Sequence, residues 1–266
     1  MHPVLFELFG FQIPSFGVMM ALGFVLGLAL SSWIAKHKGL APDRLLEVAP
    51  WLILSAVLGA RLFYFVYFPD VFWQDPFQAM ISRGGLVWYG GVLGCLVALL
   101  VVTRQLRIPF FKLTDIIVPG AALGLALGRI GCFLAGCCFG GPCALPWAVV
   151  YPVGHETHPH AVHPAPLYES VAAFVLAGLL LWVSRRFPML GVTSWTFVVG
   201  YGIIRFVIEY TRGDRLIWFE PWDLSASQVM SLVGIVLGSV MIAVSFKNKS
   251  NNNKPANENT LSAVSL

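Results

Sequence analysis

Residues 123–141, LGLALGRIGCFLAGCCFGG, decide the fold of this chain. The stretch is apolar and rich in glycine and alanine, with a single arginine, Arg129. From Gly120 to Gly140 the glycines recur at spacings of three to five residues, which on a helix gives a face that a neighbouring helix can approach closely. An arginine at bilayer depth costs roughly 2.5–3.5 kcal/mol. We therefore expect a membrane helix in which Arg129 faces a polar cavity and meets an anion.

The composition of the whole chain agrees with a membrane protein. Of its 266 residues, 58% are hydrophobic and only 11% are charged, whereas soluble domains carry about 25% charged residues. The basic residues lie in short scattered groups without interleaved aromatics, so we expect no nucleic-acid partner. The first ten residues lack a basic segment, and the apolar run 13–35 is longer than the core of a signal peptide. This run is therefore predicted to be a retained first span.

Seven apolar stretches are long enough to cross a bilayer. We predict an all-α, polytopic membrane domain over residues 1–246 and a polar, disordered cytoplasmic tail over residues 247–266. The predicted spans are residues 14–35, 46–68, 85–103, 115–138, 166–184, 191–211 and 224–246.

The loop charges predict the orientation of these spans. Of the 17 Lys and Arg residues, eleven fall in alternate loops and the tail, three fall on the opposite side, and three lie inside spans. Because basic loops stay in the cytoplasm, the N-terminus is predicted outside and the C-terminus in the cytoplasm. The eleven are Lys36, Lys38, Arg44, Arg104, Arg107, Lys112, Arg185, Arg186, Lys247, Lys249 and Lys254.

Three arginines inside predicted spans are the main functional candidates: Arg61, Arg129 and Arg205. Burying all three costs roughly 7–10 kcal/mol, which favours a functional reason. Glu209 and Tyr201 lie four residues after and before Arg205, on the same helix face. The structural alternative is an ion pair between Arg205 and Glu209, with Arg61 extending to the interface. Since guanidinium groups bind phosphate through paired hydrogen bonds, the expected ligand is a phosphate-bearing lipid.

Tyr89 lies near the outer part of the third predicted span, beside Gly90 and Gly91. A tyrosine in a span commonly serves packing or the interfacial aromatic belt. Near buried arginines it could also carry a proton or donate to a phosphate.

The longest predicted outer loop is rich in cysteine and histidine. Its spacing does not match a closed tetrahedral metal site, so we predict no metal there. We interpret Cys132 as a small packing residue facing the cavity, or alternatively as a reactive thiol beside Arg129. The loop residues concerned are Cys137, Cys138, Cys143, His155, His158, His160 and His163.

Several motifs in register resemble the prolipoprotein diacylglyceryl transferases of bacterial inner membranes. The central one, LGRIGCFLAGCCFG, is similar to that family's Gly-Arg-x-Gly-x-Phe signature. A lone signature would be weak, but the match runs in order from about residue 12 to residue 245. The other motifs are IPSFGVMMALGFVLG, GARLFYFVYF, GGLVWYGGVLG, LPWAVVYP, HPAPLYES and YGIIRFVIEYTRGD.

The resemblance implies transfer of the diacylglyceryl group of phosphatidylglycerol to the lipobox cysteine of a secreted preprolipoprotein. A thioether forms and glycerol phosphate leaves. By motif position, Arg129 and Arg205 would bind the headgroup and promote departure of phosphate, and Glu209 would orient Arg205. Tyr201 would line the same cavity. Apart from the resemblance, Arg61 is a further candidate for binding the lipid, and Tyr89 is a candidate catalytic residue. Gly136 and Gly140 would leave room for lipid or peptide.

This sequence departs from well-known members of the family at three positions. Tyr89 replaces a histidine, Cys132 replaces an asparagine and Phe16 replaces a tyrosine. A phenol with a pKa of about 10 is a weaker base at neutral pH than imidazole. The identity of the base is therefore open.

We expect a multi-pass enzyme of the bacterial inner (cytoplasmic) membrane that acts as a monomer within the bilayer and needs no cofactor. Its partners would be phosphatidylglycerol and preprolipoprotein signal peptides. Two alternatives stay open: a family paralogue with another acceptor, and a non-enzymatic carrier of lipids or metal ions. A carrier would favour internal repeats, and the sequence shows no convincing one.

Overall fold

The computed structural model describes residues 3–8, 11–70, 87–213, 217–219 and 222–252. Within these ranges the chain forms seven α-helices, six of them long and apolar enough to cross a membrane. The seventh, α5 (Trp88–Gln105), is apolar but shorter. The prediction of a helical, polytopic membrane protein is confirmed.

Each predicted span corresponds to one helix. Helix α8 continues into the 3-10 helix η1 (Glu209–Thr211), and α9 extends six residues past the predicted start of the tail. The rest of that tail, from residue 253, lies outside the described residues. Besides α5, the helices are α1 (Ser15–His37), α2 (Asp43–Tyr67), α6 (Phe110–Ala135), α7 (Ala165–Arg186), α8 (Val192–Ile208) and α9 (Ala226–Asn252).

The helices belong to two compact units. The first comprises residues 1–27 and 118–266, and the second comprises residues 28–117. Helices α1 and α6 each run through both units. The first unit holds α7, α8 and α9 entirely, and the second holds α2 and α5.

In the first unit, α1 crosses α6 through glycines. A Cβ atom on Gly27 would lie only 2.7 Å from the carbonyl oxygen of Gly120, and one on Gly23 would lie 3.0 Å from that of Gly124. No other residue type allows backbones to come so close. The prediction that the glycine-rich face of residues 120–131 receives a neighbouring helix is confirmed.

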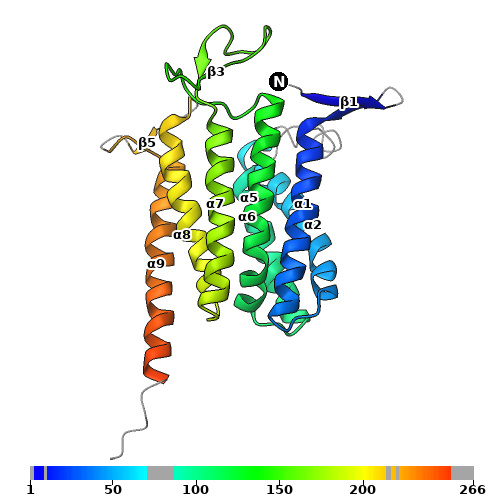
Figure 1. Ribbon diagram of the computed structural model, residues 1–266, viewed down its shortest axis with the longest axis vertical. Helices are drawn as coiled ribbons and strands as arrows, with labels where there is room; N and C mark the ends of the chain where they lie inside the picture. Colours follow the sequence, from blue (N-terminus) through cyan, green and yellow to red (C-terminus); the bar gives the residue numbers. More distant parts are fainter. Residues whose placement is uncertain (1–2, 9–10, 71–86, 214–216, 220–221, 253–266) are drawn as a thin grey trace, which may run out of the picture. The chain divides into compact units, whose positions relative to one another are not determined.

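Helices α7, α8 and α9 stand side by side in the same unit (Figure 1). The hydroxyl of Ser170 on α7 donates a hydrogen bond of 2.8 Å to the Ala126 carbonyl on α6. Buried Leu176 and Leu180 form a core with Ala122, against which Tyr201 of α8 packs. These contacts bring the polar side chains of α6, α7 and α8 into one unit.

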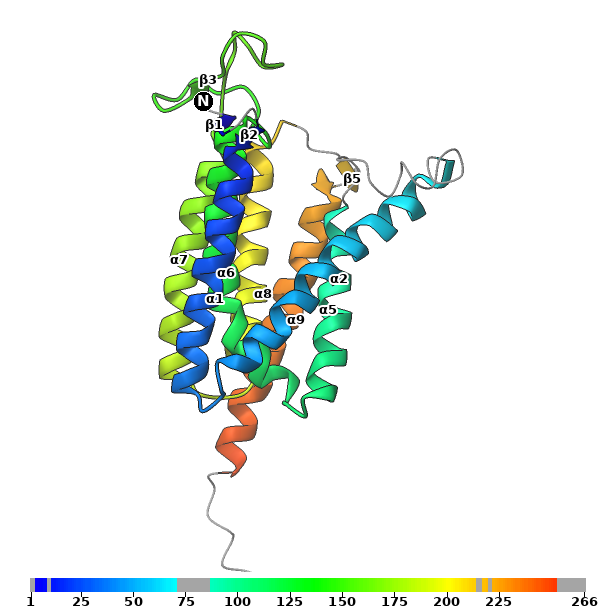
Figure 2. The same ribbon diagram turned by 90° about the vertical axis from the view of Figure 1, so that its right-hand side faces the viewer.

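In the described part of this unit, three short antiparallel strand pairs, which were not predicted from the sequence, accompany the helices. They lie toward one end of its helices (Figures 1 and 2). Strand β1 (Val4–Leu8) pairs with β2 (Phe11–Pro14), β3 (Val149–Val150) pairs with β4 (Ala161–Val162), and β5 (Ile217–Phe219) pairs with β6 (Leu224–Ser225).

In the second unit, α2 and α5 pack closely through Gly59, Gly90 and Gly94. A Cβ atom on Gly59 would lie 2.3 Å from the Gly90 carbonyl oxygen. The Val87 amide also donates a hydrogen bond of 3.2 Å to the Ala60 carbonyl. This bond ties the start of α5, next to Tyr89, to the turn of α2 that precedes Arg61.

Candidate active site

Arg129 on α6 forms a buried ion pair with Glu169 on α7. Its Nη2 atom lies 2.9 Å from Glu169 Oε1, and the two side chains are 17% and 3% exposed. No acidic residue lies three or four positions from Arg129 in the sequence. The nearest counter-charge comes instead from the neighbouring helix.

Tyr201 on α8 connects this pair to the second arginine. Its hydroxyl donates to Glu169 Oε1 over 3.4 Å. It also interacts electrostatically with both Arg129 and Arg205. The ring stacks on that of Phe197 one turn earlier, with ring planes 5° apart. Tyr201 therefore contacts the first ion pair and interacts with both arginines.

Arg205 on α8 forms the second buried pair, with Glu209 in η1. Arg205 Nη2 lies 2.8 Å from Glu209 Oε2. The other carboxylate oxygen, Oε1, accepts hydrogen bonds from the hydroxyls of Ser225, at 2.7 Å, and Ser227. These bonds fix the carboxylate, and through it the guanidinium of Arg205.

The serines that hold Glu209 belong to the N-terminus of α9. The Gln228 amide donates to Ser225 Oγ at 3.3 Å, and the Ser225 amide donates to Gln228 Oε1 at 3.0 Å. This reciprocal arrangement is a capping box. Because a helix N-terminus carries partial positive charge, it also stabilises the nearby carboxylate of Glu209.

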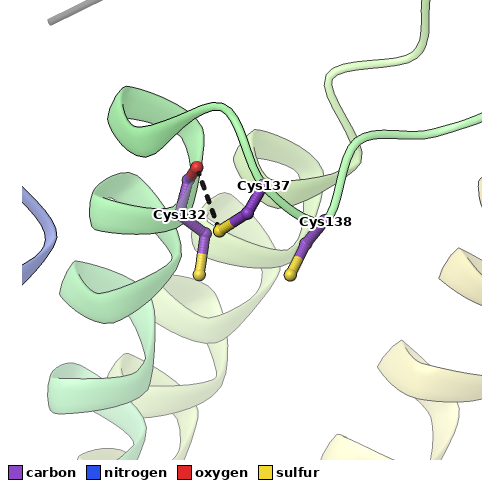
Figure 3. A group of neighbouring side chains, drawn as sticks. All are labelled: Cys132, Cys137 and Cys138. Atoms are coloured by element: carbon purple, nitrogen blue, oxygen red, sulfur yellow. Dashed lines mark hydrogen bonds between the residues drawn. The ribbon is translucent and has the colours of Figure 1, made fainter. Parts of the chain in front are cut away.

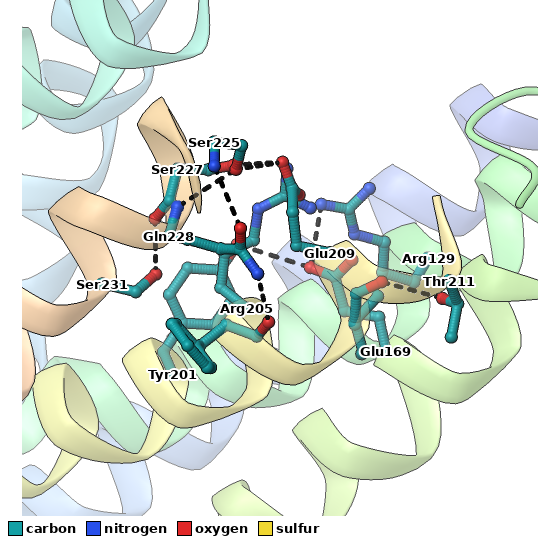
Figure 4. A network of polar contacts seen from close by, with 12 residues as sticks. Arg129, Glu169, Tyr201, Arg205, Glu209, Thr211, Ser225, Ser227, Gln228 and Ser231 are labelled. Atoms are coloured by element: carbon teal, nitrogen blue, oxygen red, sulfur yellow. Dashed lines mark hydrogen bonds and ion pairs between the residues drawn. The ribbon is translucent and has the colours of Figure 1, made fainter. Parts of the chain in front are cut away.

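The two ion pairs form one network across α6, α7, α8 and α9 (Figure 4). Its two arginines and two glutamates balance in charge. Two guanidinium nitrogens nevertheless remain buried without a hydrogen-bond partner among the described residues: Nε of Arg129 and Nη1 of Arg205. Buried donors in native proteins nearly always have a partner. The oxygen atoms of an anionic ligand would supply both nitrogens with the acceptors that they lack.

The network lies closer to the helix ends than the sequence suggested. Arg129 is six residues from the end of α6, which corresponds to about 9 Å along the axis. Arg205 is three residues from the end of α8, and Ser225 immediately precedes α9. A site at this level suits a lipid headgroup better than one at the centre of the spans.

The segment after α6 is tightly anchored. Gly136 adopts a φ of +78°, a left-handed conformation that ends the helix. At Gly140, a Cβ atom would lie 2.4 Å from the Thr211 carbonyl oxygen, so only glycine fits. The Gly140 amide donates to the His163 carbonyl, and the Gly141 amide to that of Thr211, both at 2.9 Å. The space at Gly140 is therefore filled by the protein itself.

Three cysteines converge at this anchored segment. The Sγ atoms of Cys132, Cys137 and Cys138 all lie within 4.8 Å of one another (Figure 3). Hydrogen bonds from the thiols of Cys132 and Cys137 lower the pKa of the Cys138 thiol, and the positive charges of Arg129 and Arg212 lower it further. From the sequence, Cys132 was not predicted to lie with the other two.

Two histidines of the same loop, His155 and His163, make contacts away from the cysteines. His155 stacks on the buried ring of Tyr151 at 4.1 Å, and its Nε2 lies 2.8 Å from the Gly136 carbonyl oxygen. Burial raises the pKa of Tyr151 to about 12. His163 contacts the Tyr168 hydroxyl, to which Trp147 Nε1 donates at 2.8 Å. These residues shape the loop and do not join the cysteine cluster.

The two remaining predicted site residues lie in the second unit. Arg61 is on α2, and Tyr89, with 42% of its surface exposed, is in the first turn of α5. The Val87 amide, two residues before Tyr89, donates a hydrogen bond to the carbonyl of Ala60, which directly precedes Arg61. The backbone beside Tyr89 therefore lies close to the backbone beside Arg61. Their assignment to the site rests on the sequence.

Glu169 is the principal site residue that sequence reasoning missed. It lies inside the predicted span 166–184, where an ionisable residue is by itself a functional signal. Ser225 and Ser227 were missed as well. The pattern Ser225-Ala226-Ser227-Gln228 has the form of a capping box, which gives a local signal for the first of them.

Fold and site together define a polytopic membrane protein with a buried, charge-balanced arginine site near its helix ends. Residues 3–244 match the family model of the prolipoprotein diacylglyceryl transferases. The chain belongs to this family, and is a membrane transferase of lipoprotein biosynthesis. The resemblance drawn from the sequence motifs is thereby confirmed.

Three relatives illustrate the extent of the match, each a phosphatidylglycerol–prolipoprotein diacylglyceryl transferase. The Clostridium tetani protein is 35% identical over 243 residues, covering 90% of this chain and 95% of the relative. The Synechococcus elongatus protein is 33% identical over 247 residues, covering 89% and 84%. The Geobacter sulfurreducens protein is 33% identical over 253 residues, covering 93% and 96%.

Proposed function

We propose that this chain transfers the diacylglyceryl group of phosphatidylglycerol to the cysteine thiol of a prolipoprotein, with Arg129 and Arg205 binding the lipid phosphate. The observation that carries the assignment of these residues is their pair of buried, unpartnered nitrogens. A phosphate oxygen would satisfy each through a charge-assisted hydrogen bond, which is stronger than a neutral one.

The two glutamates prepare the arginines for this ligand. Glu169 and Glu209 each hold one Nη2 atom, which fixes the guanidinium plane and directs its remaining nitrogens. Preorganised donors are effective because they need no rearrangement when negative charge develops on the leaving phosphate. Tyr201, which contacts Glu169, adds a polar group to the same wall.

The reaction replaces a carbon–oxygen bond by a carbon–sulfur bond. The acceptor thiol loses its proton, and its sulfur attacks the carbon of the diacylglyceryl group that bears the phosphate. Glycerol phosphate then leaves with the bonding electrons. A thiol with a pKa of about 8.5 is only slightly ionised at neutral pH, so it needs a base. We assign this role to Tyr89, with Arg61 supporting its phenolate and adding to the lipid site.

The remaining assignments complete the proposal. The enzyme acts as a monomer in the bacterial inner (cytoplasmic) membrane, with its N-terminus outside. Gly136 and Gly140 contribute by shaping the segment beside Arg129, since one ends α6 and the other allows the packing against Thr211.

The test is a transfer assay with the purified full chain, phosphatidylglycerol labelled in its acyl chains, and a lipobox peptide. Label on the peptide cysteine supports the transferase, and a peptide with serine at that position is the control. Headgroup binding without any transfer would contradict the proposal and favour a carrier. Complementation of a cell depleted of its own diacylglyceryl transferase provides an independent test in the membrane.

A further inference from the structure

The three clustered thiols have the geometry of a metal site. In a tetrahedral site with Zn–S bonds of about 2.3 Å, the sulfur atoms are about 3.8 Å apart. The Sγ atoms of Cys132, Cys137 and Cys138 already lie within 4.8 Å of one another. Closing on an ion therefore requires each pair to approach by about 1 Å or less.

The surroundings of the cluster favour one bound cation with access from solvent. Cys132 is 9% exposed, whereas Cys137 is an exposed residue. The turn at Gly136 returns the chain over the end of α6, which places Cys137 and Cys138 opposite Cys132 (Figure 3). The sulfurs thus come from two rigidly connected segments, and the ion can enter beside Cys137.

The charges around the three cysteines also suit a bound Zn²⁺ ion. Three thiolates and one Zn²⁺ ion leave a net charge of −1. Arg129 interacts electrostatically with Cys132 and Cys138, and Arg212 interacts with Cys138. Because Glu169 already balances Arg129, the positive charge of Arg212 offsets the remaining negative charge, as a partly buried site requires.

Among the described residues, the cluster supplies three ligands. No additional His, Cys, Asp or Glu joins it in the described part of the chain. His155 is close in sequence, but its Nδ1 accepts from the Thr157 amide and its Nε2 contacts the Gly136 carbonyl. Structural zinc sites have four protein ligands, whereas catalytic sites have three and keep one position open.

We propose that Cys132, Cys137 and Cys138 bind one Zn²⁺ ion and leave its fourth position open to the thiol of the acceptor cysteine. The binding of the acceptor thiol at the open position rests on the proposed transferase function. It revises the expectation from the sequence that the enzyme contains no metal and needs no cofactor.

A Zn²⁺ ion at this site would explain how the acceptor thiol loses its proton although the phenol of Tyr89 is a weak base. Binding of the acceptor thiol to zinc releases its proton to solvent and leaves a metal-bound thiolate. The thiolate sulfur then forms the bond to the glycerol carbon while the carbon–oxygen bond to phosphate breaks. Glycerol phosphate leaves with the electron pair. The thioether product carries no negative charge, binds the metal weakly and dissociates, so the site returns to its starting state.

The first measurement is metal binding by the full chain in detergent. Protein stripped by a chelator under reducing conditions is titrated with Zn²⁺ and, for its visible spectrum, with Co²⁺. We expect one ion per chain and the sulfur-to-cobalt charge-transfer band of a thiolate site. Cys138→Ser should weaken binding roughly 100-fold or more, since even changes around the ligands cost 10–100-fold. Cys95→Ser and Cys143→Ser are matched controls and should bind as the unchanged protein does.

The second measurement tests the open position. A lipobox peptide added to the Co²⁺ form should shift the spectrum as a fourth sulfur binds, and the same peptide with serine should not. Three results would overturn the inference: no stoichiometric metal, a disulfide among the three cysteines in protein purified without reductant, or a spectrum indifferent to the cysteine peptide.

Transfer activity separates this inference from the proposed function. Full transfer by chelator-stripped protein, confirmed free of metal, would overturn the role of zinc and leave the transferase assignment standing. Conversely, metal binding with a response to the peptide thiol but no transfer would support the site and contradict the proposed function.

Discussion

Replacing Arg129 by lysine separates phosphate binding from simple charge balance. In the structure, Arg129 Nη2 holds Glu169 at 2.9 Å while its Nε is buried without a partner. Lysine keeps the positive charge and can still pair with Glu169. It has only one nitrogen, however, and cannot hold the carboxylate and a phosphate in the same geometry.

The expected decrease in kcat/KM follows from the missing hydrogen bond between Nε and the phosphate. A hydrogen bond to a charged group contributes about 1.5–3 kcal/mol. If Nε makes such a bond to the phosphate in the transition state, Arg129→Lys should lower kcat/KM roughly 10- to 150-fold. The variant should still fold, because the buried Glu169 keeps a counter-charge.

The assay is the initial rate of transfer at several phosphatidylglycerol concentrations, with thermal unfolding measured on the same preparations. Arg44→Lys is a matched control, since Arg44 also pairs with a glutamate, Glu47 at 3.2 Å, but on the surface. That variant should transfer normally. An Arg129→Lys enzyme with kcat/KM within twofold of the unchanged protein would refute the assignment, because twofold corresponds to only about 0.4 kcal/mol.

Three further predictions concern the rest of the site. Glu209→Gln should reduce transfer at least tenfold, because one lost charge-assisted bond to Arg205 is worth about 1.5 kcal/mol or more; unchanged initial rates would show that Arg205 needs no orientation. Tyr89→Phe should slow turnover and move its pH profile if the phenol takes the thiol proton, and an unaltered profile would remove Tyr89 from the mechanism. Gly140→Ala should lower the unfolding temperature, since the added methyl would meet the Thr211 carbonyl; Gly178→Ala, with open space at its Cβ, is the control and should unfold normally.

The membrane fold was predictable because hydrophobicity and loop charge act locally. Each of the seven predicted spans corresponds to a helix, and glycine spacing identified the face of α6 that receives α1. The short hairpins were not predicted. Strands of two to five residues carry too little pattern to stand out beside apolar helices.

The site was only partly predictable because its contacts join different helices. Pairing of Arg205 with Glu209 follows from helical periodicity, four residues apart, and the structure contains it. Pairing of Arg129 with Glu169 depends on how α6 and α7 pack, which no local rule reports. The approach of Cys132 to Cys137 and Cys138 likewise depends on the left-handed turn at Gly136.

The most direct test of the central claim is an experimental structure of this protein with phosphatidylglycerol bound. We predict phosphate oxygens about 2.7–2.9 Å from Nε of Arg129 and Nη1 of Arg205, with both glutamate pairs retained. A headgroup bound away from these two nitrogens, with the arginines contacting only Glu169 and Glu209, would contradict it.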